Sequence, residues 1–175
     1  MLGPGDILDY IRGIQIVISG YQGYAKEKKS ESDILVRREL SRTAQRARNH
    51  IQNIHDDLVK KDDFENSRLV KSCMSEIDLL MEDVDKGGVG VTHGFTSGVR
   101  SMTQRDMNLL IKHDHDVIIM VTEAVRISNN AEQEYSESGL ISALPIISSC
   151  KQKITSCRGF FSERSVFLSS LRKRK

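Results

Sequence analysis

Tryptophan is absent from this sequence, proline occurs only twice, and aromatic residues make up 5% of the chain. With so few aromatic side chains, a hydrophobic core has to be built from aliphatic residues. Because proline is scarce, most of the chain is free of the residue that most strongly breaks helices. No run of about eighteen apolar residues occurs, so the sequence predicts no transmembrane segment.

Cysteine is also scarce, and the three residues Cys73, Cys150 and Cys157 form no CxxC pair. This spacing argues against a zinc site or a redox motif and favours a reduced, intracellular protein. Asp6 and Asp9 interrupt the apolar residues near the N-terminus, and no basic segment precedes them, which argues against a signal peptide. The sequence therefore predicts a soluble, cytoplasmic protein.

Charge of one sign does not dominate the chain. The 175 residues include 29% charged and 38% hydrophobic residues, and the formal net charge is +2. This composition favours one globular domain over residues 1–175 and argues against disorder. Because the net charge is small, any electrostatic function must come from local clusters of charged residues.

Apolar residues recur at alternating steps of three and four along most of the chain, and no segment shows sustained period-two alternation. This pattern predicts an all-α protein built as an antiparallel bundle of five to six helices. The clearest apolar seam belongs to the second predicted helix and consists of Val36, Leu40, Ala44, Ala47, Ile51, Ile54 and Leu58. The expected helix caps are Ser32, then Asn66 or Ser67, and a capping box from Ser101 to Gln104.

Residues 85–101, DKGGVGVTHGFTSGVRS, contain five glycines and interrupt the helical pattern. They predict a long, flexible crossover loop between the third and fourth helices. A Walker-type phosphate loop does not fit, because the segment lacks the closing Gly-Lys-Ser/Thr. Further on, Pro145 is expected to kink the fifth helix or to start a new one, and Gly159 to end it. The chain closes with a basic segment at 172–175.

Five arginines occur close together in residues 35–55, LVRRELSRTAQRARNHIQNIH. At 100° per residue, one set of polar residues falls opposite the apolar seam. This set, named here the Arg/Asn stripe, consists of Arg38, Arg42, Arg46, Asn49 and Asn53. Guanidinium groups suit bidentate contacts with phosphate or carboxylate, so the stripe predicts RNA or another nucleic acid as a partner. In the other interpretation the stripe pairs with carboxylates of the third helix (EIDLLMEDVD), of an acidic protein surface or of a neighbouring copy.

Arg48 and His55 lie two helical turns apart on one flank of the same predicted helix. The segment RNHIQNIH resembles the R-x4-6-H motif of HEPN ribonucleases, all-α domains that pair so that two motifs form one metal-independent site. The resemblance implies that Arg48 would stabilise a phosphate and His55 would assist proton transfer. In the other interpretation His55 is a helix-end residue that bonds to Asp56 or to a backbone carbonyl.

A second resemblance lies at residues 131–144, AEQEYSESGLISAL. It is similar to the QEY-x-E-A stretch of translin and TRAX proteins, helical oligomers that bind or cut RNA, and the NIH that closes the second helix also matches that family. The resemblance implies a role in metal binding for Glu134 and Glu137. The residues by themselves favour a helix N-terminus, where the helix dipole stabilises both carboxylates.

The remaining cluster of metal-ligand types is KHDHD at residues 112–116. On a helix His113 and Asp116 are neighbours, whereas His115 points elsewhere, so the segment offers two ligands and no Glu-x-x-His pair. The sequence therefore predicts no metal and no cofactor.

Together these features predict a non-enzymatic, self-associating interaction protein whose Arg/Asn stripe binds RNA or another nucleic acid. Two alternatives stay open. One is a metal-independent, HEPN-like ribonuclease that uses Arg48 and His55. The other is a purely structural assembly subunit, a homo-oligomer in which the stripe pairs with carboxylates of a neighbouring copy.

Overall fold

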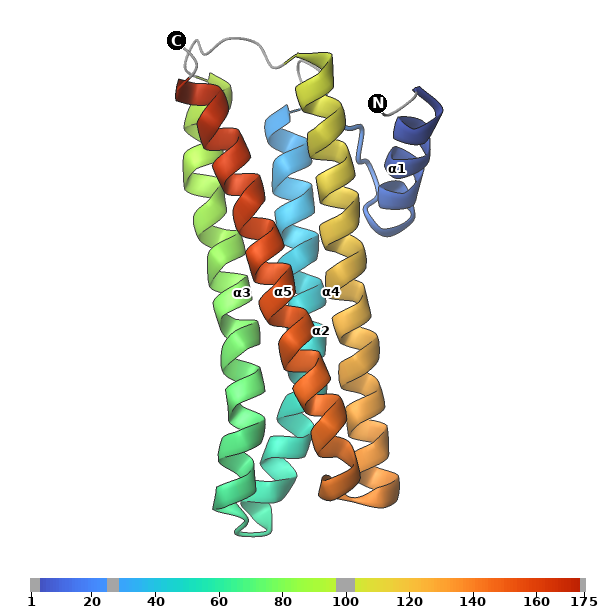
Figure 1. Cartoon of the computed structure of the whole chain (residues 1–175), viewed down its shortest axis with the longest axis vertical. Coiled ribbons are helices and arrows are strands. Elements are labelled where there is room, and N and C mark those ends of the chain that lie inside the picture. The colour runs from blue at the N-terminus through green and yellow to red at the C-terminus, as the bar shows by residue number, and fades with distance from the viewer. Residues whose placement is uncertain (1–3, 25–28, 97–102, 174–175) are drawn as a thin grey trace. The chain divides into compact units, whose positions relative to one another are not determined.

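The computed structural model describes residues 4–24, 29–96 and 103–173. Nearly all of these residues lie in α-helices (Figure 1), which are α1 (Pro4–Val17), α2 (Lys29–Lys60), α3 (Phe64–Thr96), α4 (Gln104–Ser138) and α5 (Leu140–Lys173). No strand occurs within the described ranges. The all-α class and the predicted count of five to six helices are thus confirmed, with five helices in the described residues, while the antiparallel order stays a prediction.

The chain divides into two compact units, each assembled from distant parts of the sequence. Unit 1 comprises residues 1–40, 83–119 and 159–175, and unit 2 comprises residues 41–82 and 120–158. The assignment of residues 1–175 to one domain stays a prediction.

The predicted apolar seams form the interiors of both units. Every residue of the second-helix seam, from Val36 to Leu58, is buried. The apolar residues that recur at steps of three and four in α3 are buried as well, namely Val70, Cys73, Ile77, Leu80 and Val84. Steps of three and four place these side chains on one side of a helix, so packing that side inward buries the whole series. Ala44 and Ala47 are fully buried in unit 2.

The helix caps differ from the sequence prediction. Asp63 caps α3, because its Oδ1 accepts the Asn66 backbone N–H at 3.2 Å. Thr103 and Asp106 form a reciprocal capping box at the start of α4, with N···O distances of 3.2 Å and 3.1 Å. The predicted caps Asn66 and Ser67 therefore lie inside α3, just as Ser32 lies inside α2. Ser101 lies outside the described residues.

The prediction of a glycine-rich loop was wrong over residues 85–96, because α3 continues to Thr96. Each glycine costs about 1 kcal/mol in a helix interior, but extending a helix that has already formed is far easier than starting one. No proline occurs in this stretch to stop the extension. The rest of the predicted loop, residues 97–101, lies outside the described residues.

The expected breaks in the fifth helix were also wrong in part. α5 passes through Gly159 and ends at Lys173 rather than at the glycine. It starts at Leu140, so Pro145 lies near its beginning rather than opening a new helix. The break before α5 is instead made by Gly139, whose φ of 83° belongs to the left-handed region that favours glycine.

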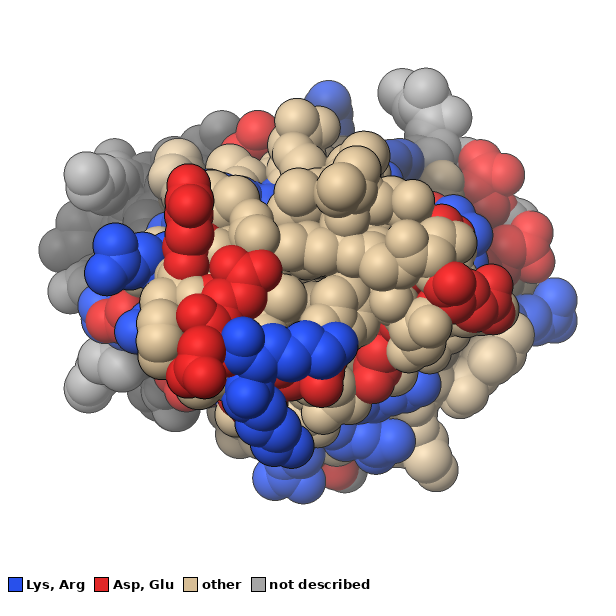
Figure 2. Space-filling view, turned by 90° about the horizontal axis from the view of Figure 1, so that it is seen from below, with Lys and Arg blue, Asp and Glu red and all other residues tan. Residues whose placement is uncertain are grey.

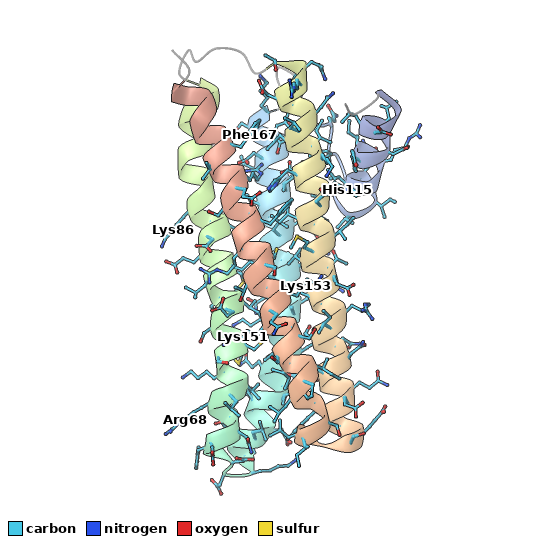
Figure 3. All side chains as sticks on the ribbon, viewed as in Figure 1. Arg68, Lys86, His115, Lys151, Lys153 and Phe167 are labelled. Carbon is cyan, nitrogen blue, oxygen red and sulfur yellow. The ribbon has the colours of Figure 1, made fainter. Side chains whose placement is uncertain are left out.

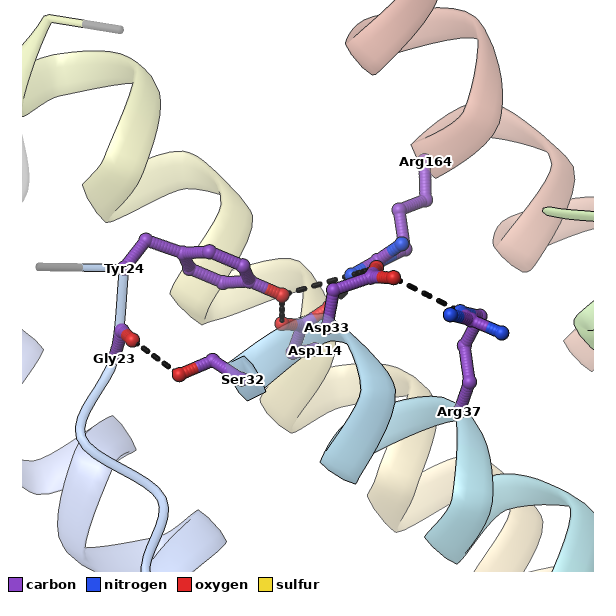
Figure 4. A network of polar contacts seen from close by, with 7 residues as sticks. All are labelled: Gly23, Tyr24, Ser32, Asp33, Arg37, Asp114 and Arg164. Atoms are coloured by element: carbon purple, nitrogen blue, oxygen red, sulfur yellow. Dashed lines mark hydrogen bonds and ion pairs between the residues drawn. The ribbon is translucent and has the colours of Figure 1, made fainter. Parts of the chain in front are cut away.

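A buried ionic network joins α2, α4 and α5 within unit 1 (Figure 4). Arg164 is 1% exposed, and the carboxylates facing it belong to Asp114 and Asp33, which are 0% and 2% exposed. The guanidinium donates through Nε to Asp114 Oδ1 at 2.8 Å and through Nη2 to Tyr24 Oη at 2.8 Å. Arg164 Nη2 also lies 2.7 Å from Asp33 Oδ1.

The network is balanced in charge and largely satisfied in hydrogen bonds. Tyr24 O–H donates to Asp114 Oδ2, and Arg37 Nε donates to Asp33 Oδ2 at 2.9 Å. Two arginines therefore face two aspartates. Burial by itself lowers the pKa of Arg164, but the facing Asp114, Tyr24 and Asp33 raise it well above its usual value. The guanidinium accordingly stays charged in the interior, as buried charges do when they are paired.

Within unit 1, α1 lies against α4 (Figure 1). A Cβ atom added to Gly13 would approach the His115 ring to 2.9 Å, so a larger residue at this position would have to push the ring aside. The Tyr10 and His115 ring centroids are 4.9 Å apart. Figure 3 marks the position of His115 on α4.

Candidate nucleic-acid interface

All five residues of the Arg/Asn stripe are exposed on α2, as the sequence predicts. Four of them, from Arg42 to Asn53, belong to unit 2, and Arg38 belongs to unit 1. The stripe is exposed because the apolar seam of the same helix packs inward, which leaves the opposite side of α2 to solvent.

The arginines of α2 fall into two groups by their ion pairs. Arg37 pairs with Asp33 at 2.9 Å, and Arg48 pairs with Asp78 at 2.6 Å. Arg38 and Arg46 have no ion-pair partner among the residues that the structure describes. Two guanidinium groups of the outward stripe, those of Arg38 and Arg46, therefore lack a carboxylate among the described residues.

The flank that carries Arg48 and His55 is occupied by internal hydrogen bonds. Arg48 donates through Nε to Asp78 Oδ1 at 2.6 Å and through Nη1 to Gln52 Oε1 at 2.5 Å. The predicted contact of His55 with Asp56 is present, with Nδ1 3.1 Å from Oδ1, but His55 is not a helix-end residue because α2 continues to Lys60. A phosphate reaching Arg48 would have to compete with the Asp78 carboxylate.

A polar cluster that the sequence did not reveal joins α2 to α4 in unit 2. His50 Nδ1 lies 2.6 Å from Glu132 Oε2, and Asn53 Nδ2 donates to Glu132 Oε1 at 2.7 Å. The His50 and Glu132 side chains are 28% and 30% exposed. Because 82 positions separate them in the sequence, no local pattern could have predicted the pair.

Tyr135 of the AEQEYSESGLISAL segment contacts α2 just beyond its NIH sequence, within unit 2. Tyr135 O–H donates to Asp57 Oδ2 at 2.5 Å, and Lys61 Nζ lies 2.7 Å from the same carboxylate oxygen. Hydrogen bonds from Lys61 and Tyr135 lower the pKa of Asp57. The Glu137 carboxylate accepts a hydrogen bond from Gln133 at 2.9 Å. Glu134 and Glu137 belong to no cluster of three candidate metal ligands among the described residues.

The KHDHD segment likewise does not gather around one point. Lys112 pairs with Asp116 at 2.7 Å, and His115 Nδ1 lies 3.3 Å from the same carboxylate. Asp114 belongs to the buried network with Arg164, and His113 bonds to a backbone carbonyl. Lys112 and His115 thus share the Asp116 carboxylate, whereas His113 and Asp114 bond to partners outside the segment.

A cavity of about 320 Å³ lies between α4 and α5 in unit 1. Its apolar walls include Leu109 and Phe160, and His113 stacks on the Phe160 ring at a centroid distance of 4.2 Å. His113 Nε2 donates to the Phe160 carbonyl at 2.8 Å, so Nδ1 carries the lone pair, and Nδ1 is buried without a hydrogen-bond partner. The Nδ1 atom is therefore enclosed, which leaves it unable to contact a ligand.

The burial of His113 gives a pH-dependent prediction. Desolvation lowers the pKa of His113 below 6.5, so the unfolded chain takes up this proton at a higher pH than the folded protein does. The contribution of neutral His113 to the free energy of unfolding is therefore fully present above about pH 6.5. It decreases as the pH falls from there towards the pKa of His113 in the folded protein. We expect His113→Gln, which keeps a side-chain donor for the Phe160 carbonyl, to show a shallower fall. Urea unfolding at several pH values measures this, and equal slopes for both proteins would contradict it.

Two broader findings bear on the interface. Within the described part of the chain, no helix is both long and apolar enough to cross a lipid bilayer. The chain matches no protein-family profile, no curated protein and no solved structure. A function must therefore be argued from the geometry of the chain itself.

Proposed function

We propose that this protein is a non-enzymatic, self-associating helical interaction protein that presents the Arg/Asn stripe of α2 to RNA or another nucleic acid. The observation that carries the proposal is the pairing of the arginines on α2. Arg38 and Arg46 on the stripe lack a carboxylate among the described residues, whereas Arg37 and Arg48 on the other sides of the helix have one.

The chemistry of the stripe suits a phosphate backbone. Guanidinium groups are always charged, only donate hydrogen bonds, and match phosphate oxygens in a bidentate geometry. Asn49 Oδ1 accepts a hydrogen bond from Gln45 at 2.8 Å, which leaves the Asn49 amide N–H groups free to donate. Residues at a spacing of three or four lie one helical turn apart, so the stripe forms a row of donors along α2.

Exposed apolar side chains support the self-association part of the proposal. Phe64 and Ile141, in the first turns of α3 and α5, are 55% and 87% exposed. Figure 2 looks onto the end of unit 2 where these helices begin, and it shows uncharged surface bordered by acidic and basic side chains. Exposed apolar side chains such as Phe64 and Ile141 suit a protein–protein interface, whose buried centre is more apolar than its rim.

The test is RNA binding by a variant that lacks two stripe arginines. We expect Arg38→Ala/Arg46→Ala to weaken binding of a fluorescently labelled RNA at low salt by about tenfold or more, because each lost phosphate contact forfeits counterion release. Fluorescence anisotropy measures the affinity. Arg68→Ala is the matched control, because Arg68 is an exposed arginine that points outward from α3 (Figure 3). No detectable RNA binding by the natural protein, or equal losses in the two variants, would refute the proposal.

The two alternatives predict different outcomes in the same preparations. A HEPN-like ribonuclease would cleave RNA without metal and would lose cleavage in His55→Ala. A structural assembly subunit would form salt-sensitive oligomers without affinity for nucleic acid. The absorbance ratio of the purified protein at 260 and 280 nm, measured together with its oligomeric mass, separates these outcomes from RNA binding.

A further inference from the structure

Glu132 fixes the orientation and the proton position of the His50 ring. An ionised carboxylate only accepts hydrogen bonds, so the 2.6 Å contact requires a proton on His50 Nδ1. Asn53 holds the second oxygen of the same carboxylate at 2.7 Å, which prevents Glu132 from rotating away. In the neutral ring, Nε2 is then a hydrogen-bond acceptor in a set position.

The Nε2 atom of His50 is open to a partner. Nε2 makes no hydrogen bond to any described residue. It is also absent from the set of buried polar atoms without a hydrogen-bond partner, so it is not enclosed by the protein. It therefore reaches solvent. His50 follows Arg46 by one helical turn and precedes Asn53 by three residues, which places the acceptor at the edge of the stripe.

The charge around His50 selects a donor rather than a phosphate. With a neutral ring, the His50–Glu132 pair carries one negative charge, and both Nε2 and a phosphate oxygen are acceptors. A phosphate is therefore repelled at this point and attracted one turn earlier, at Arg46. In RNA each sugar is bonded directly to a phosphate and carries a 2′-OH, which is a donor that DNA lacks.

We propose that His50, held by Glu132 and Asn53, accepts a hydrogen bond from a ribose 2′-OH and makes the stripe select RNA over DNA. This inference rests on the proposed function and specifies the ligand class of the same surface. Glu132 acts as a positioning residue, because it sets the ring without touching the nucleic acid. One hydrogen bond of this kind corresponds to a selectivity of about two- to tenfold.

The test compares three duplexes of one sequence, each about 16 base pairs long, made of RNA, of 2′-O-methyl RNA and of DNA. The methyl group removes the donor but keeps an RNA-like helix, so it separates the hydroxyl from the shape of the duplex. We expect His50→Ala to weaken binding of RNA by about two- to tenfold and to leave the other two affinities unchanged. Glu132→Gln should also reduce the preference for RNA. The glutamine amide can donate to Nδ1, so the proton of the His50 ring is no longer held on Nδ1. His55→Ala is the matched control and should change none of the affinities.

The outcomes distinguish this inference from the proposed function. Unchanged DNA affinity in His50→Ala shows that the variant is folded and that its stripe is intact. If the natural protein binds all three duplexes equally, or if His50→Ala weakens all three alike or none, selection through the 2′-OH is refuted while nucleic-acid binding stands. If the natural protein binds no duplex at low salt, both are refuted.

Discussion

Replacing Arg164 with methionine is expected to lower the free energy of unfolding by about 3–5 kcal/mol. Methionine is of similar length and lacks the charge, so the Asp114 carboxylate would remain buried without a facing cation, and Asp33 would keep only Arg37. Tyr24 would lose the donor to its hydroxyl oxygen as well. Breaking one partner of a buried ionic network is costly because it leaves uncompensated charge in the interior. Urea denaturation followed by far-UV circular dichroism measures the change.

The matched control for this prediction is Arg126→Met. Arg126 pairs with Glu123 at 2.7 Å, but the arginine side chain is 64% exposed. Water screens an exposed ion pair and solvates the carboxylate that remains, so we expect little change in stability. Equal unfolding midpoints for Arg164→Met and Arg126→Met would show that the buried network does not stabilise unit 1.

The second large effect is expected at Gly23, a buried turn residue before α2. Its φ of 68° lies in the left-handed region, and an added Cβ would come within 3.3 Å of Ile111 Cδ1. Its carbonyl also accepts the Ser32 hydroxyl at 2.5 Å, which restricts movement of the backbone. We expect Gly23→Val to destabilise the protein by about 2–3 kcal/mol, because a β-branched side chain is strained at positive φ and crowds the Ile111 side chain.

Gly20 provides a control in which the strain is present and the crowding is absent. Its φ is 83°, and nothing lies within 4 Å of an added Cβ. Gly20→Val should therefore show the backbone cost alone, and Gly23→Val should unfold at a lower urea concentration. A loss in Gly20→Val as large as that in Gly23→Val would mean that packing against Ile111 contributes nothing.

Residues whose role depends on helix periodicity could be predicted from the sequence. The seam from Val36 to Leu58 is buried and the stripe from Arg38 to Asn53 is exposed. Both could be predicted because successive residues of an α-helix are placed about 100° apart around its axis. The prediction of a loop at the glycines after Asp85 was wrong, because α3 continues to Thr96. Helix propensity is a weak effect for each residue, and a helix already in place extends through several poor residues.

Residues whose role depends on distant partners could not be predicted. Arg164 lies in a segment of mixed polar and apolar residues, SERSVFL, and its partners Asp33, Asp114 and Tyr24 come from other parts of the chain. His50 likewise gave no signal in the sequence, because the residue that holds its Nδ1 is Glu132 of α4. Pairing of this kind arises from the three-dimensional packing of helices and leaves no local signal in the sequence.

The most direct test of the stripe as a nucleic-acid contact is the salt dependence of RNA binding. For a duplex, the slope of log affinity against log salt is about −0.9 for each contacted phosphate. If the three stripe arginines each contact a phosphate, the slope of the natural protein should be steeper than that of Arg38→Ala/Arg42→Ala/Arg46→Ala by about two to three. Identical slopes for the two proteins, or no binding by the natural protein at low salt, would contradict RNA binding through the Arg/Asn stripe.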